Sequence, residues 1–159
     1  MVYDYGSDNI SYFEYKAINE LMHSHSAEFG RDLRTIVVFG PLLTGQETFD
    51  IDLLEVVDNW QGPQTMTFDS TPSLPLRGTL RLHFLSSAAF ENLMSQKDQS
   101  LLNLLRDGYH VVYEVPAGYA RSILVRSLTN NNYLNYLIKD DLFSTDERSS
   151  DPRKPLRGC

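Results

Sequence analysis

The hydrophobic positions along the chain follow two spacings, and each spacing predicts its own kind of element. Over residues 9–29 the apolar side chains recur at helical spacing, with Ser11 and Glu14 placed as a capping pair and Gly30 as a stop. Short apolar runs rich in β-branched or aromatic residues predict strands instead. These runs cover residues 33–39, 50–58, 79–85 and 109–115.

The segments between the predicted strands carry the signals of helix starts and of turns. Ser86 or Ser87 is suited to cap one short helix, and a second helix is expected to begin at Gln99 and to end before Gly108. Residues 59–78 are polar and contain several prolines and glycines. That composition predicts a long loop or an irregular hairpin connection.

The C-terminal part separates into a helical and a polar stretch. Residues 119–143 predict one or two helices, whereas residues 144–159 show no apolar pattern and are expected to form a flexible tail. We therefore expect one domain over residues 1–143. The order of its elements predicts an α/β (α+β) fold, a small mixed sheet flanked by helices.

The composition narrows the class of protein. The chain has 159 residues, of which 42% are hydrophobic and 22% charged, as is typical of a globular domain. Its net charge of −7 argues against broad nucleic-acid binding, which needs clustered basic residues. The single cysteine, Cys159, cannot form an internal disulfide. No leader and no membrane-spanning apolar run is visible, so we expect a cytoplasmic protein.

Two aspartates in the second predicted strand are the strongest candidates for chemistry. Because side chains alternate along a strand, Asp50 and Asp52 should project from one face while Ile51 and Leu53 project from the other. Two carboxylates about 4 Å apart repel each other by roughly 4 kcal/mol at an effective dielectric constant near 20. Such a pair favours a cation, and Mg²⁺ held by carboxylates and substrate phosphates is a common solution.

A glycine-containing turn precedes these aspartates and carries a family resemblance. Gly40 and Gly45 follow an apolar run, and Asp50-Ile51-Asp52-Leu53 comes shortly after them. This arrangement resembles the signature of the DNA polymerase beta-type nucleotidyltransferase superfamily, and more narrowly its small single-domain (minimal nucleotidyltransferase-like) members. Residues 83–91 and 101–114 resemble later segments of the same group.

The resemblance implies a nucleotidyltransferase-like fold and a set of site residues. Gly40, Pro41 and Gly45 would bind the phosphates of a nucleoside triphosphate, and Asp50 and Asp52 would be catalytic metal ligands for Mg²⁺. The implied activity is transfer of a nucleoside monophosphate to an unknown acceptor. Small members of the family also often pair with a small helical protein in toxin–antitoxin systems, which implies such a partner here.

Two positions depart from the family pattern and support a second hypothesis. Pro41 stands where the family usually has serine, and it offers neither a hydroxyl nor an N–H donor. Arg81 stands where the third metal-binding acid is expected. An arginine there would pair with Asp50 and Asp52 and replace the metal. The second hypothesis is therefore a catalytically degenerate fold that acts as a protein-binding, antitoxin-like module.

Other interpretations of the same residues stay open. Asp50 and Asp52 could be solvated side chains of an ordinary strand, and His83, which shares the face of Arg81, could line the site. Glu55 is expected to be a surface charge near the strand end. A generic interpretation is an acidic domain that forms a homo-oligomer.

Overall fold

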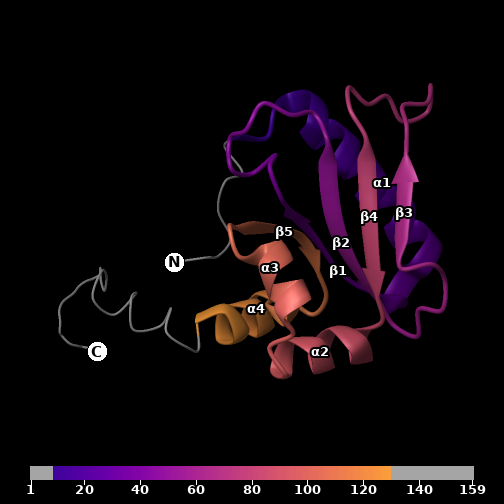
Figure 1. Cartoon of the computed structure of the whole chain (residues 1–159). Coiled ribbons are helices and arrows are strands. Elements are labelled where there is room, and N and C mark those ends of the chain that lie inside the picture. Colours follow the sequence, from indigo (N-terminus) through magenta and orange to yellow (C-terminus); the bar gives the residue numbers. More distant parts are fainter. Residues whose placement is uncertain (1–8, 130–159) are drawn as a thin grey trace. The chain divides into compact units, whose positions relative to one another are not determined.

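Five strands form one mixed sheet with helices on both of its faces (Figure 1). The computed structural model describes residues 9–129. Of these residues, 9–124 belong to one compact unit and 125–129 to a second. The elements are α1 (Tyr12–Phe29), the 3₁₀ turn η2 (Gly30–Asp32), β1 (Leu33–Phe39), β2 (Ile51–Val57), β3 (Thr65–Phe68), β4 (Leu80–Leu85), α2 (Ser87–Ser95), α3 (Gln99–Leu105), β5 (Tyr109–Glu114) and α4 (Tyr119–Thr129).

The strand order is β3-β4-β2-β1-β5, so β2 and β1 lie inside the sheet. β1 pairs antiparallel with both β2 and β5, β2 pairs parallel with β4, and β3 pairs antiparallel with β4. The expectation of a small mixed sheet flanked by helices is therefore confirmed. The predicted helical content of residues 130–143 and the polar tail lie outside the described residues.

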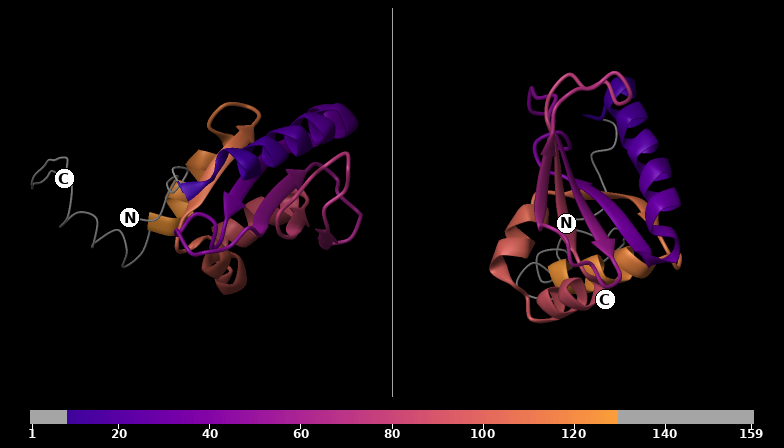
Figure 2. Two further views of the ribbon diagram at one scale, coloured as in Figure 1. Left: turned by 90° about the horizontal axis from the view of Figure 1, so that it is seen from above. Right: turned by 90° about the vertical axis from the view of Figure 1, so that its right-hand side faces the viewer.

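Alternating side chains divide the sheet into two packed faces. On one face, Ile36, Val38 and Leu53 form a hydrophobic cluster with Ile18 and Leu21 of α1. The other face is covered by α2 and α3 (Figure 2), which bury Phe90, Met94, Leu101, Leu102 and Leu105. The β2 strand is buried along its whole length because neighbouring strands flank it on both sides. This central position explains why its sequence is a nearly continuous apolar run.

Helix α1 begins with the predicted capping pair. The Ser11 hydroxyl accepts a hydrogen bond from the Glu14 backbone N–H at 3.4 Å, and Arg77 donates to the buried Glu14 carboxylate at 3.0 Å. Burial alone would raise the pKa of Glu14, but hydrogen bonds from Arg77 and Ser11 lower it below its usual value. The loop that carries Arg77 is thereby tied to the start of α1.

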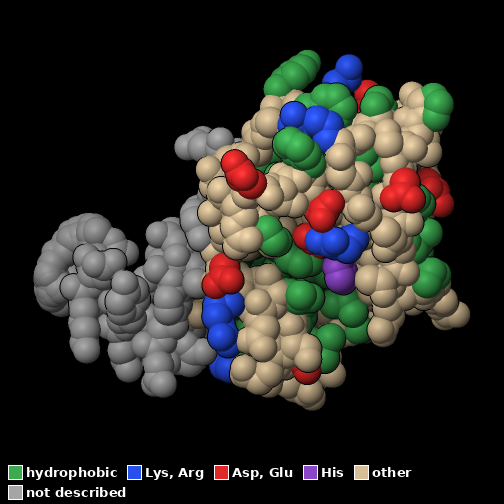
Figure 3. Space-filling model, turned by 45° about the horizontal axis from the view of Figure 1, so that its top comes forward, with side chains coloured by type: hydrophobic (Ala, Val, Ile, Leu, Met, Phe, Trp, Pro, Cys, Tyr) green, Lys and Arg blue, Asp and Glu red, His purple; other side chains and the backbone are tan. Residues whose placement is uncertain are grey.

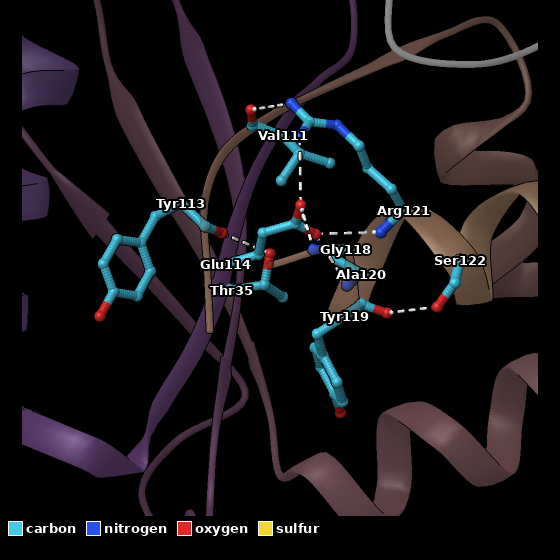
Figure 4. A network of polar contacts seen from close by, with 9 residues as sticks. All are labelled: Thr35, Val111, Tyr113, Glu114, Gly118, Tyr119, Ala120, Arg121 and Ser122. Atoms are coloured by element: carbon cyan, nitrogen blue, oxygen red, sulfur yellow. Dashed lines mark hydrogen bonds and ion pairs between the residues drawn. The ribbon is translucent and has the colours of Figure 1, made fainter. Parts of the chain in front are cut away.

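A carboxylate at the end of β5 caps helix α4 (Figure 4). Glu114 accepts hydrogen bonds from the backbone N–H groups of Gly118 at 2.8 Å and Ala120 at 3.0 Å. It also pairs with the Arg121 guanidinium at 3.1 Å. The first N–H groups of a helix lack partners within the helix, so an internal carboxylate here satisfies them and neutralises the positive end of the helix dipole.

Two sequence-based predictions about the strands were wrong. Residues 59–78 contain a strand, β3, at the edge of the sheet, which a run of only four residues between prolines did not reveal. The second strand begins at Ile51, so Asp50 precedes it instead of lying within it. None of the described helices has the length and apolar character needed to cross a membrane.

Candidate functional site

The two predicted aspartates meet the predicted arginine on the sheet face opposite α1. Asp52 and Arg81 are register partners on the parallel strands β2 and β4, and alternation points both side chains to the same side. Arg81 Nε lies 2.7 Å from Asp52 Oδ1, and Arg81 Nη2 lies 3.0 Å from Asp52 Oδ2. Arg81 Nη1 lies 3.5 Å from Asp50 Oδ2. The predicted bidentate pairing is therefore present, and the two aspartates share one guanidinium.

The hydrogen bonds to Asp52 hold the guanidinium in its charged form. They raise the pKa of Arg81 above its usual value, and burial opposes this shift only in part. The side chain of Asp52 is 8% exposed, whereas that of Arg81 is 40% exposed. The carboxylate of Asp52 is thus compensated inside the protein, while Arg81 is partly exposed to solvent. Figure 3 shows acidic, basic and histidine side chains lying next to one another on one face of the molecule.

Asp50 is fixed by the start of the neighbouring strand. Its Oδ1 accepts a hydrogen bond from the Thr79 backbone N–H at 2.8 Å, and its own N–H donates to the Thr48 hydroxyl at 3.1 Å. A Cβ atom at Gly78 would lie 2.6 Å from Asp50 Oδ1 and 2.6 Å from the Phe49 backbone. Only glycine lets the chain enter β4 this close to Asp50.

The glycine turn lies against the aspartates, as predicted, but its backbone groups are largely used within the turn. Gly40 has a φ of +89°, and a Cβ atom there would lie 3.0 Å from Asp52 Oδ2. The N–H groups of Leu43, Thr44 and Gln46 donate to carbonyls of residues 40 and 41 at 3.0–3.4 Å. No helix stands between β1 and β2, so this turn offers no helix N-terminus to a phosphate.

A pocket of about 360 Å³ opens between the glycine turn, β4 and α3. Gly40, Pro41, Asp52, Arg81 and His83 contribute to its lining, together with Phe39, Thr44, Gln46, Asn103, Leu104 and Asp107. A pocket of this size suits a small ligand or a few inserted side chains. His83, which the sequence suggested could line the site, contributes to this pocket, whereas Gly45 does not.

Burial lowers the pKa of His83 below its usual value, with Asp52 opposing and Arg81 assisting the shift. The imidazole packs against the Phe39 ring at a centroid distance of 5.3 Å. His83 is therefore uncharged at neutral pH, and the pocket wall at this position is aromatic in character.

This shift predicts a pH dependence of stability. On acidification, His83 of the unfolded chain takes up a proton near pH 6.5, whereas His83 of the folded chain does so only at a lower pH. The folded state is therefore destabilised relative to the unfolded state as the pH falls from 6.5 through the pKa of the folded chain. We expect the free energy of unfolding to decline more steeply on acidification in the wild type than in His83→Gln. Urea unfolding from about pH 7.5 to about pH 5 measures both slopes. Parallel curves would contradict the expectation.

The residues at the site do not fit a magnesium centre in this arrangement. The resemblance implies three carboxylates, and the third position carries a guanidinium that pairs with the other two. Within residues 9–129, no group of three His, Cys, Asp or Glu side chains is placed to hold a metal ion. Asp50 and Asp52 lie close together as predicted, but the cation between them is the Arg81 guanidinium.

A buried polar pair, on the α1 face of the sheet, escaped the sequence-based predictions. Glu55 was expected at the surface, but its side chain is fully buried in β2. His25 Nδ1 lies 2.8 Å from both carboxylate oxygens of Glu55. The signal was the position of Glu55 within an apolar run, on the same face as Leu53 and Val57.

The sequence matches no protein-family model, and no curated protein matches it either.

Proposed function

We propose that the chain is a nucleotidyltransferase-like domain without transferase activity, which acts by binding another protein. The observation that carries this proposal is the Arg81 guanidinium, which binds Asp52 in a bidentate manner and reaches Asp50. In the family that the sequence resembles, the corresponding carboxylates would hold metal ions. Here the Arg81 guanidinium offsets part of their charge from within the chain.

The charges and donors at the pocket also disfavour a nucleoside triphosphate. Asp50 and Asp52 together outweigh the single charge of Arg81, and Asp107 adds a further carboxylate to the lining. A triphosphate would therefore meet net negative charge unless metal ions intervened. Pro41 has no N–H group, and the N–H groups of Leu43 and Thr44 already have partners within the turn.

Protein binding is the other activity that the family resemblance implies. The resemblance to small nucleotidyltransferases that pair with a small helical protein supports an antitoxin-like role. Co-expression with the proteins encoded beside this chain's gene, followed by size-exclusion chromatography, tests it. We expect a stable hetero-complex with a helical protein. A chain that forms no hetero-complex with any of them, or only a homodimer, would contradict the proposal.

Transferase activity is the second candidate, and the pocket itself favours it. A cavity of about 360 Å³ beside Gly40 and Asp52 stands where the resemblance would place a nucleotide. This candidate requires Arg81, whose side chain is 40% exposed, to leave Asp52 when Mg²⁺ arrives.

Thermal unfolding distinguishes the two candidates. We expect millimolar Mg²⁺ with any of the four common nucleoside triphosphates to leave the melting temperature of the wild type unchanged, because Arg81 blocks the carboxylates. Asp52→Asn serves as the control. A rise in melting temperature that needs both metal and nucleotide, and that Asp52→Asn abolishes, would establish the transferase candidate instead.

A further inference from the structure

A groove continues from the pocket along the sheet face opposite α1. A second hollow of about 240 Å³ adjoins the first, and the two share His83 and Leu104 in their linings. We call the two together the α3 groove, because α3 forms one wall and β4 the other. Its lining extends from Gly40 near the aspartates to Gln64 and Thr65 at the edge strand β3.

The walls of the α3 groove are mainly apolar. Leu54, Leu85 and Leu101 line the second hollow, and Leu104 lies where the two hollows meet. Leu104 is 40% exposed, which is unusual for a leucine on a helix that otherwise buries its apolar side chains. The uncharged imidazole of His83 adds to this apolar surface. Apolar side chains of a partner would gain free energy by leaving water here.

The charged groups along the α3 groove are mostly carboxylates. Asp52 and Asp107 belong to the first hollow and Asp98 to the second, against Arg81 among the lining residues. The net charge of the whole chain, −7, has the same sign. An occupant with cationic side chains is favoured by this potential, and an anionic one is repelled.

We propose that the α3 groove binds a segment of a partner protein that combines apolar side chains with lysine or arginine. Apolar side chains enter beside Leu104, and the cationic groups face the carboxylates at the two ends. The inference rests on the proposed protein-binding function and names its surface and the chemistry of its partner. It assigns no role to Asp50 and Asp52 as metal ligands.

A synthetic peptide provides the probe. A fluorescein-labelled 16-residue helical peptide with leucines on one face and lysines beside them is titrated with the protein at about 0.15 M salt. The same peptide with glutamate in place of lysine is the matched control. We expect the lysine peptide to bind at least tenfold more tightly, by fluorescence anisotropy. Equal binding of the two peptides, or no binding of either, would overturn the proposal.

Surface variants decide whether the peptide occupies the α3 groove. Leu104→Ser and Asp107→Lys should each weaken binding at least fivefold. Val115→Ser and Glu28→Lys make comparable changes at exposed positions that line neither hollow and should leave binding unchanged. Amide shifts in a ¹⁵N spectrum should concentrate in α3 and β4. Equal losses in both pairs of variants, or shifts centred on α1, would overturn the assignment.

The experiments distinguish a failure of the α3 groove from a failure of the proposed protein-binding function. If the chain forms a hetero-complex that survives Leu104→Ser and Asp107→Lys, protein binding stands and the α3 groove is wrong. If metal and nucleotide raise the melting temperature through Asp52, the proposed function fails whatever the peptide does.

Discussion

Replacing His25 with alanine should lower the free energy of unfolding by about 3 kcal/mol, the cost of leaving a buried carboxylate without its hydrogen-bond partner. Glu55 lies fully buried in the central strand β2, and both of its carboxylate oxygens lie 2.8 Å from His25 Nδ1. With His25 in place, the Glu55 side chain has no exposure to solvent, so its hydrogen bonds come from within the chain. Urea unfolding at pH 7 measures the change.

Two further variants identify the cause. His23→Ala removes an exposed histidine from the same helix and should change stability by no more than about 0.5 kcal/mol. The double variant His25→Leu/Glu55→Leu removes the charge together with its partner and should recover most of the lost stability. A double variant as unstable as His25→Ala, or equal losses for the two histidines, would contradict this explanation.

Arg81→Asp should have the second large effect, and it should act in two opposite directions. Without metal, three carboxylates would crowd one site, and we expect the free energy of unfolding to fall by about 2–3 kcal/mol. This is less than the cost of breaking a fully buried pair, because Arg81 is 40% exposed. With Mg²⁺ or Mn²⁺ the same carboxylates become a ligand set. Metal at about 100 times its dissociation constant should return about 2.7 kcal/mol.

The comparison variants separate metal binding from simple charge effects. Arg31→Asp makes the same charge change at an exposed position of η2 and should respond to metal no more than the wild type. Arg81→Ala frees the aspartates without adding a third acid, so its metal binding should lie between that of Arg31→Asp and that of Arg81→Asp. Calorimetric titration with Mn²⁺ compares all four proteins. If Arg81→Asp binds no more metal than Arg31→Asp, then Arg81 does not occupy a latent metal position.

Alternation along strands made the Asp52–Arg81 pair predictable. Once residues 50–57 were identified as a strand, the alternation of successive side chains placed Ile51 and Leu53 on one face and Asp52 on the other. The position of Arg81 relative to Asp52 came from the family resemblance, and the register of β2 and β4 agrees with it. The capping pair of α1 was predictable for a similar reason, because it depends only on residues three positions apart.

Features that depend on tertiary contacts were not predictable. Alternation places Glu55 on the same face as Leu53, but its partner His25 is 30 residues away on α1. Only the docking of that helix makes a buried carboxylate tolerable. The edge strand β3 was missed because its four residues form a strand only through pairing with β4. The hydrogen bonds that occupy the glycine turn likewise depend on the local path of the backbone.

The position of β1 inside the sheet bears on how the chain folds. Thr35 of β1 donates a hydrogen bond to the carbonyl of Tyr113 in β5, and these residues are 78 positions apart. A ribosome must therefore synthesise almost the entire domain before β1 acquires its second neighbour. Until then β1 presents an unpaired, strongly apolar edge to other nascent chains. Such distant pairing slows folding, and it makes β5 the element that closes this edge against aggregation.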